Sequence, residues 1–326
     1  MKLASLKVPG KFDGELILAT SDLKRAVKAT SIASSLREAV ERWAECEPRL
    51  RELDAQLKAG TAPGTFDVKP EALMACLPRT WLFADGSAFI HHIKLVRKAR
   101  NAALPETLET VPLMYQAESG QFLSPLEGIP QRSFDHGTDM EAEVGVITDF
   151  VPMGTSPEEA LKKIRLVVLI NDVSLRGLIP AELASGFGFF VSKPTKALSP
   201  FALTPDELGV AWKDGRLHLP LNVRWNDEFF GQANAGEMFF HFGQLIAHAA
   251  QTRNLAAGSL IGSGTVSNDK DGAGSSCIVE KRTLEQIEIG KPVTPYMKVG
   301  DRVEIWMETP DGNPLFGRID QRVVQA

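Results

Sequence analysis

The sequence has few cysteines, no long apolar run and no surplus of positive charge. Its three cysteines, Cys46, Cys76 and Cys277, are odd in number and far apart, which argues against a disulfide framework and favours a reducing compartment. No apolar stretch approaches the ~20 residues of a membrane-spanning helix, and residues 1–7 contain no apolar signal core. The formal net charge is -5 and there is no basic block, which argues against nucleic acid as a partner. We therefore expect a cytoplasmic protein that binds neither membranes nor nucleic acid.

The rest of the composition is ordinary for a globular protein, with 326 residues of which 44% are hydrophobic and 24% charged. That length is sufficient for a full core and for more than one domain. The turn-rich segment 59–65 and the residues up to Pro78 supply a boundary, so we expect a small N-terminal domain over 1–77 and a larger domain over 78–326. In the first domain we expect a strand at 15–20 and a helix that Ser34 or Ser35 caps and Pro48 interrupts.

Alternating residues at 139–147 predict a strand that carries Glu141 and Glu143 on the same side. Two carboxylates at i and i+2 repel one another, and each raises the pKa of the other. A hard cation such as Mg²⁺ or Ca²⁺ between them would remove that repulsion. A solvent-facing edge strand whose charges prevent aggregation would show the same pattern. This strand alone therefore does not distinguish a metal site from an edge strand.

The apolar run 164–170 predicts a buried strand, and Asp172 follows it. A carboxylate at that place must be paired, hydrogen-bonded or metal-bound, or it caps the next turn through Ser174. Lys193 follows the aromatic segment 186–190. Its ammonium group either reaches out to solvent or points into a dry pocket, where it would neutralise a substrate anion.

Further candidates lie on a predicted helix, a buried strand and a glycine-rich loop. His91 and His92 lie near the start of a predicted helix that follows the apolar strand at 81–84. Adjacent helical residues point in different directions, so at most one of the two faces a given pocket. That histidine could act as a general base, or it could simply pack in the core. The segment 111–116 reads as a buried strand, and 278–280 as the start of another. The loop 262–265 resembles a nest of backbone N–H groups for an anion.

Four segments together carry a family resemblance: Asp139-Met140-Glu141-Ala142-Glu143, Asn171-Asp172-Val173-Ser174-Leu175-Arg176, Val191-Ser192-Lys193-Pro194 and Gly262-Ser263-Gly264-Thr265. In order and spacing they resemble the fumarylacetoacetate hydrolase family over about residues 78–326, and the segment before them resembles the N-terminal domain of its longer members. The resemblance implies an α+β fold that is predominantly β, a mixed β-sandwich roll with a small N-terminal domain, usually as a homodimer. It also implies a divalent metal on three carboxylates and cleavage of a carbon–carbon bond in a 1,3-diketo acid.

Carried over by position, the resemblance assigns a role to each candidate residue. It implies Mg²⁺, with Mn²⁺ or Ca²⁺ as alternatives, and it implies His92 as the base that activates water. Shorter members pair that histidine with a glutamate three residues later; here Leu95 stands there, so Glu280 would take its place. Gln116 stands where relatives carry a lysine or an aspartate. The implied sets are metal ligands Glu141, Glu143 and Asp172; catalytic residues His92, Lys193 and Glu280; and substrate-binding residues Arg176, Tyr115, Gln116, Gly264 and Thr265.

The expected function is metal-dependent hydrolysis of a fumarylacetoacetate-type or acylpyruvate-type diketo acid, in the catabolism of aromatic compounds or amino acids. Two alternatives share these motifs. A decarboxylase, hydratase or lyase of 2-oxo acids needs the same metal site. A non-catalytic organic-acid-binding protein would use the carboxylates for a structural Ca²⁺.

Overall fold

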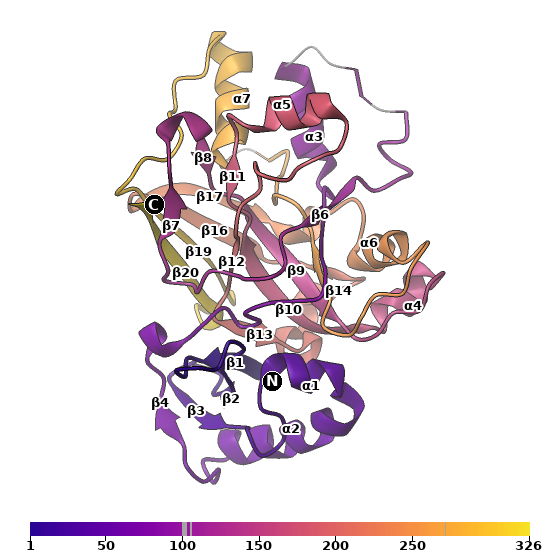
Figure 1. Ribbon diagram of the computed structural model, residues 1–326, viewed down its shortest axis with the longest axis vertical. Helices are drawn as coiled ribbons and strands as arrows, with labels where there is room; N and C mark the ends of the chain where they lie inside the picture. The colour runs from indigo at the N-terminus through magenta and orange to yellow at the C-terminus, as the bar shows by residue number, and fades with distance from the viewer. Residues whose placement is uncertain (100–102, 105, 271) are drawn as a thin grey trace.

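The computed structural model describes residues 1–99, 103–104, 106–270 and 272–326 (Figure 1). Its largest element is an 11-stranded sheet that runs through most of the molecule. The order is β4 (Phe66–Asp67), β3 (Arg25–Lys28), β2 (Glu15–Ala19), β1 (Lys2–Leu6), β13 (Phe201–Leu203), β10 (Ile164–Asn171), β9 (Ala142–Thr148), β18 (Leu260–Gly262), β5 (Phe83–Gly86) and β6 (Met114–Ala117), and β12 (Ala197–Leu198) pairs with β10.

A second sheet of five strands packs against the middle of the first. Its order is β17 (Glu228–Asn234), β16 (Pro220–Trp225), β19 (Arg302–Glu308), β20 (Pro314–Gln325) and β7 (Ile129–Gln131). Two short antiparallel pairs complete the strands: β8 (Thr138–Asp139) with β11 (Ser174–Leu175), and β14 (Trp212–Lys213) with β15 (Arg216–Leu217). The first of these pairs brings Asp139 opposite Ser174, which is how the glutamate strand and the segment around Asp172 come together.

Seven α-helices lie outside the sheets in the described part of the chain (Figure 1). They are α1 (Leu36–Glu41), α2 (Trp43–Lys58), α3 (Ile90–Ala99), α4 (Pro157–Leu161), α5 (Ile179–Ser185), α6 (Phe242–Ala249) and α7 (Ile278–Ile289). Helices α3, α5 and α7 gather at one end of the molecule, and α1 and α2 lie with the N-terminal strands at the other. None of the helices in the described ranges is both long and apolar enough to cross a membrane.

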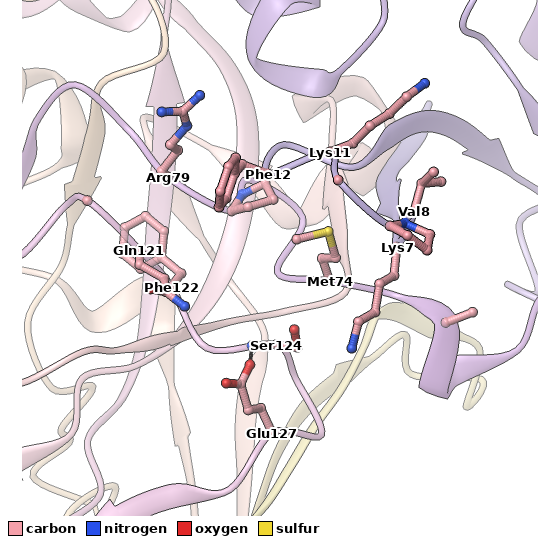
Figure 2. A pocket seen from close by; sticks show the side chains of 15 residues that line it. Lys7, Val8, Lys11, Phe12, Met74, Arg79, Gln121, Phe122, Ser124 and Glu127 are labelled. Carbon is pink, nitrogen blue, oxygen red and sulfur yellow. Dashed lines mark hydrogen bonds between the residues drawn. The ribbon is translucent and has the colours of Figure 1, made fainter.

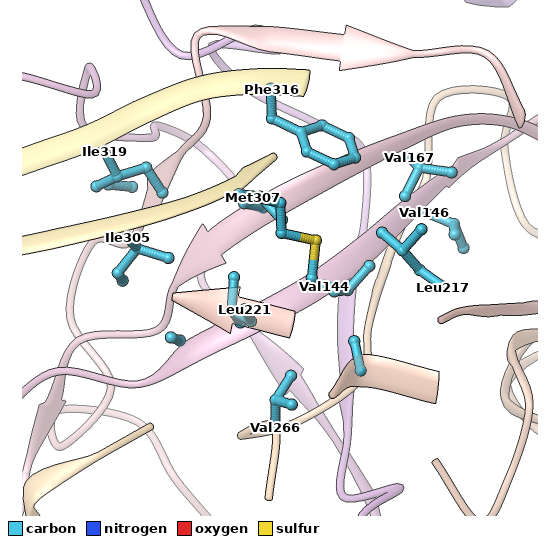
Figure 3. Packing of buried hydrophobic residues seen from close by; sticks show 14 of the residues in the cluster. Val144, Val146, Val167, Leu217, Leu221, Val266, Ile305, Met307, Phe316 and Ile319 are labelled. Atoms are coloured by element: carbon cyan, nitrogen blue, oxygen red, sulfur yellow. The ribbon is translucent and has the colours of Figure 1, made fainter. Parts of the chain in front are cut away.

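Both faces of the large sheet are buried, which explains the continuous apolar run of β10. One face carries Val144, Val146 and Val167, which meet Met307 and Phe316 of the five-stranded sheet (Figure 3). The other face belongs to a second cluster that also contains residues of α1, α2 and the N-terminal strands. A strand with two buried faces needs apolar residues at successive positions. Strand β9 keeps Glu143 because the start of this strand enters the site described below.

Three expectations about secondary structure were wrong. Pro48 does not break the helix; the break lies at Arg42, and Pro48 falls in the second turn of α2, where it removes one backbone hydrogen bond. Residues 278–280 begin helix α7 and not a strand. The strand expected at 111–116 begins only at Met114, and Val111 is exposed. The serine cap was right, because Ser35 accepts a hydrogen bond from the Glu38 N–H.

Candidate active site

Three buried carboxylates meet where β5 and β10 end and β9 begins. Asp85 lies on β5, Glu143 on β9, and Asp172 directly after β10. Each offers an oxygen, and these three oxygens lie within 4.8 Å of one another. Strand β18 lies between β9 and β5, and its Gly262 pairs with Asp85. A Cβ at Gly262 would collide with the Asp85 carboxylate, so a glycine is required there for the three groups to meet.

The electrostatics of this carboxylate trio (Asp85, Glu143 and Asp172) call for a cation. Burial and the charge of Asp172 raise the pKa of Asp85 well above its usual range, and burial and Asp85 do the same for Glu143. Neither Glu143 oxygen has a hydrogen-bond partner among the described residues. Buried polar atoms are otherwise almost always paired. An all-oxygen set of this kind fits a hard divalent cation such as Mg²⁺, Mn²⁺ or Ca²⁺.

Glu141 is held differently from the trio. Lys193 Nζ lies 2.5 Å from its Oε2, and Arg176 Nη2 lies 2.5 Å from its Oε1. Burial alone would raise the pKa of Glu141, but the charges of Arg176 and Lys193 bring that pKa well below its usual range. Lys193 also lies 2.5 Å from Asp172 Oδ2 and so joins Glu141 to the trio. The structure thus groups Asp85, which the sequence did not single out, with Glu143 and Asp172, and it places Glu141 in an ion pair beside them.

The histidine and the glutamate assigned to base chemistry form a pair. His92 lies in the first turn of α3 and Glu280 in the first turn of α7, and the two helices pack together. His92 Nδ1 is 2.7 Å from Glu280 Oε2. Glu280 is buried, whereas the His92 side chain keeps 15% exposure toward the pocket. His91, its neighbour, does not line this pocket; it lies 3.9 Å from the exposed Asp269.

Asp139 fixes the start of α7 and therefore the place of Glu280. It is fully buried and accepts hydrogen bonds from the N–H groups of Ile278 (2.7 Å) and Val279 (3.0 Å). Arg176 Nε lies 2.8 Å from the same carboxylate. Unpaired N–H groups at a helix start favour an anion there. Burial raises the pKa of Asp139 despite Arg176, but these donors still satisfy the group.

Most of these groups line one pocket of about 250 Å³: Asp85, His92, Glu141, Glu143, Arg176 and Lys193. Tyr115 donates a hydrogen bond of 3.0 Å to Asp172 Oδ2, and its ring meets Phe189 edge-on at 4.9 Å between centroids. Gly264 and Thr265 also line the pocket, but the Gly264 N–H donates to Asp85 Oδ1 at 3.2 Å. That glycine therefore binds a protein carboxylate. Of the expected residues that contact substrate, only Gln116 lies outside this pocket: it is exposed and lines a separate hollow with Arg253.

A larger hollow of about 930 Å³ lies between the N-terminal strands and the loop 120–127 (Figure 2). Phe12, Met74 and Phe122 give it an apolar wall. Two of its charged groups already have partners: Lys11 pairs with Glu15 at 2.6 Å and Arg79 with Asp13 at 2.7 Å. Glu143, whose two buried oxygens lack a partner among the described residues, lines the smaller pocket together with His92 and Lys193, and we take that pocket as the candidate active site.

Comparison with known proteins finds relatives over most of the chain. The family model described as fumarylacetoacetate (FAA) hydrolase C-terminal matches residues 82–324, and the model described as fumarylacetoacetase N-terminal domain 2 matches residues 1–79. The chain is 23% identical over 352 residues to a fumarylacetoacetase of Caenorhabditis elegans, covering 92% of this chain and 83% of the relative. It is 29% identical over 206 residues to a 2,4-didehydro-3-deoxy-L-rhamnonate hydrolase of a Sphingomonas species. This match covers 62% of the present chain and 63% of the relative's length.

Solved structures show the same fold. A fumarylacetoacetate hydrolase from Exiguobacterium antarcticum matches with a TM-score of 0.67 and 18% identity, covering 100% of both chains. A maleylpyruvate hydrolase from a Sphingobium species, solved with manganese(II) and pyruvate, matches with a TM-score of 0.65 and 16% identity, again over 100% of both chains. The predicted fold class, a predominantly β sandwich with a small N-terminal part, is confirmed. The family model matches most of this sequence, and we conclude that the chain belongs to the fumarylacetoacetate hydrolase family.

Proposed function

We propose that this protein is a metal-dependent hydrolase that cleaves a carbon–carbon bond in a 1,3-diketo acid of the acylpyruvate or fumarylacetoacetate type. One observation carries the proposal: His92, which Glu280 holds, lines the same 250 Å³ pocket as Asp85 and Glu143 of the carboxylate trio. A pocket of that size suits a small organic acid. A base, a cation site and two fixed positive side chains are the parts that hydrolysis of a diketone needs.

Asp85, Glu143 and Asp172 would hold the divalent cation, with Mg²⁺ expected and Mn²⁺ or Ca²⁺ as alternatives. Glu141 would join them only if Lys193 left its Oε2, so we propose it as a ligand second to these three. When bound, the cation supplies a positive charge that polarises carbonyl oxygens of the substrate. The unpartnered oxygens of Glu143 support this assignment.

His92 would take the proton of the attacking water. Its hydrogen bond to the Glu280 carboxylate holds the ring proton on Nδ1, which leaves the Nε2 lone pair free to accept a proton. Glu280 would then stabilise the imidazolium that forms. This dyad takes the place of the local glutamate that shorter family members use.

Lys193 and Arg176 would bind the substrate's oxygens. Each already touches Glu141, and Lys193 also touches Asp172, so their charges are fixed at the pocket wall before substrate enters. Charge that is placed in advance stabilises a transition state without reorganisation. Lys193 would stabilise the negative charge on the departing fragment, and Arg176 and Thr265 would hold a carboxylate.

We further propose that the protein is a cytoplasmic homodimer with a role in aromatic or amino-acid catabolism. The proposal also includes a boundary between the two domains after residue 77. Three free, buried cysteines are compatible with a reducing compartment. Light scattering on the purified protein tests the dimer.

An ultraviolet assay tests the reaction. The protein is stripped with chelator, and the absorbance of fumarylpyruvate, acetylpyruvate and fumarylacetoacetate is followed with and without Mg²⁺ or Mn²⁺. We expect metal-dependent loss of the diketone, which Asp172→Asn abolishes and Asp67→Asn, a change at an exposed carboxylate, leaves intact. Release of CO₂ from a 2-oxo acid would favour the decarboxylase alternative. Metal and ligand binding without turnover would favour an organic-acid-binding protein.

A further inference from the structure

A second set of metal-ligating side chains lies beside the carboxylate trio. Cys277 precedes the first residue of α7 and forms an isolated bridge with Glu141, and its side chain is completely buried. One ligand atom each from Cys277, His92 and Glu280 lie within 4.8 Å of one another. The three come from two helix starts that pack together, so the grouping rests on tertiary structure and not on sequence spacing.

The chemistry of this second set differs from that of the trio. Three carboxylates offer oxygen alone and suit hard cations, whereas a thiolate, an imidazole and a carboxylate are the ligands that Zn²⁺ takes in proteins. Zinc bonds of about 2.0–2.3 Å place neighbouring ligands roughly 3–4 Å apart. The ligand atoms lie within 4.8 Å of one another and His92 Nδ1 is 2.7 Å from Glu280 Oε2, so a bound cation would require the three side chains to shift.

The local charge favours a dication at this position. Burial raises the pKa of the Cys277 thiol, and the negative charges of Asp139, Glu280 and Glu141 raise it further, whereas Arg176 acts against them. The same negative charges attract a cation that can replace the thiol proton. His92 lies on the pocket side of the set, which gives a cation a path from solvent.

We propose that His92, Cys277 and Glu280 form a second metal site that binds a thiophilic divalent cation such as Zn²⁺ and thereby inhibits the enzyme. Binding forms a metal–sulfur bond and releases the thiol proton to solvent, with no change of oxidation state. A ring nitrogen bound to the cation cannot accept a proton, and the added charge lowers the basicity of the other nitrogen. The inhibition rests on the proposed role of His92; the binding does not.

Cobalt spectroscopy tests the binding directly. Co²⁺ is added to the full-length protein with Mg²⁺ in excess, and the thiolate-to-cobalt charge-transfer band is recorded in the near ultraviolet. Zn²⁺ affinity is measured by competition with a chromogenic chelator. The test variant is Cys277→Ser, and the matched control is Cys46→Ser, which removes a buried thiol in α2 near the opposite end of the molecule.

We expect the charge-transfer band in the wild type and in Cys46→Ser but not in Cys277→Ser. We also expect Zn²⁺ to bind at least ~10-fold more weakly to Cys277→Ser, the usual loss when a metal site is impaired. Each protein's rate with Zn²⁺ is divided by its own rate in Mg²⁺ alone. By this measure Zn²⁺ should inhibit the wild type and Cys46→Ser more strongly than Cys277→Ser. An absent band in wild-type protein, or equal Zn²⁺ affinity in Cys277→Ser, overturns the proposal. A band without turnover on any diketo acid would sustain the second site and refute the proposed function instead.

Discussion

At the level of a single residue, Glu143 illustrates a proposed metal ligand whose buried charge lowers the stability of the metal-free protein. Its carboxylate is buried, unpartnered among the described groups, and close to Asp85 and Asp172. A carboxyl whose pKa is raised by folding holds its proton more tightly in the folded chain than in the unfolded one. It therefore stabilises the fold at low pH, and that contribution is lost as the pH rises through the raised pKa.

We predict that Glu143→Gln stabilises the metal-free protein at about pH 8, because the amide removes a buried charge. The melting temperature in chelator should rise by about 2–4 °C per kcal/mol relieved. The gain should shrink toward about pH 4, where the wild-type carboxyl is protonated. Mg²⁺ should raise the melting temperature of the wild type but not of the variant. Differential scanning fluorimetry measures all three effects, and a variant that melts lower in chelator or still responds to Mg²⁺ contradicts this account.

A second prediction concerns the base. His92→Ala should lower kcat by about 10²–10⁴-fold, the usual contribution of a positioned base. Glu280→Gln should lower it less, because the ring remains and only its orientation and charge compensation weaken. The matched control is His91→Ala, whose side chain does not line the pocket. Steady-state kinetics on the diketo acid with the highest turnover measure kcat for each variant. Equal losses of kcat in His91→Ala and His92→Ala would show that His92 is not the base.

At the level of elements, the sequence located strand β9, which carries Glu143, but not the helix that carries Glu280. Ile278 and Val279 are β-branched and favour a strand locally. The helix forms because Asp139, distant in sequence, accepts their two N–H groups. Asp85 was missed for a related reason: it is a single acidic residue at a strand end, and only the pairing through Gly262 brings it to Glu143. Periodicity reports a local face, whereas both of these features depend on contacts across the fold.

The turn at Gly264 offers a prediction at the same scale. Gly264 has φ +74°, and a Cβ there would collide with the Gly86 carbonyl oxygen. Gly264→Ala should cost the left-handed backbone penalty of about 1–2 kcal/mol and a further steric cost. Gly154→Ala is the control, because Gly154 has φ +79° with nothing within 4 Å of the added Cβ. Urea unfolding measures both, and equal costs for the two variants would show that the close approach to Gly86 contributes nothing.

At the level of the whole molecule, the N-terminal part and the rest share one sheet and one core. Strand β1 pairs with β13, and Leu3 and Leu18 belong to the same apolar cluster as Ile170 and Leu198. The sequence placed a boundary near residue 77 from turn composition, but composition does not show that a sheet continues across it. The family resemblance predicted the sandwich, which the solved structures of relatives confirm. Several residues of its motifs line the candidate pocket.

This shared core predicts that residues 78–326 do not fold stably alone. Removal of residues 1–77 would expose the apolar face of β10 and the free edge of β13. We expect the full chain to unfold in a single calorimetric transition and the truncated chain to aggregate or to lose cooperative melting. Two resolved transitions, or a soluble fragment with a sharp melting curve, would show two independent units.

The central claim is that the pocket splits a diketo acid with water. The most direct test is turnover in ¹⁸O-labelled water with Mg²⁺ present, followed by mass spectrometry of the two products. Hydrolysis predicts that the acyl fragment leaves as a carboxylic acid carrying one oxygen from the solvent in its new carboxyl group, while the other fragment keeps its carbon skeleton. Release of CO₂, or addition of water to a product of unchanged carbon number, would contradict the claim and assign this site to decarboxylation or hydration.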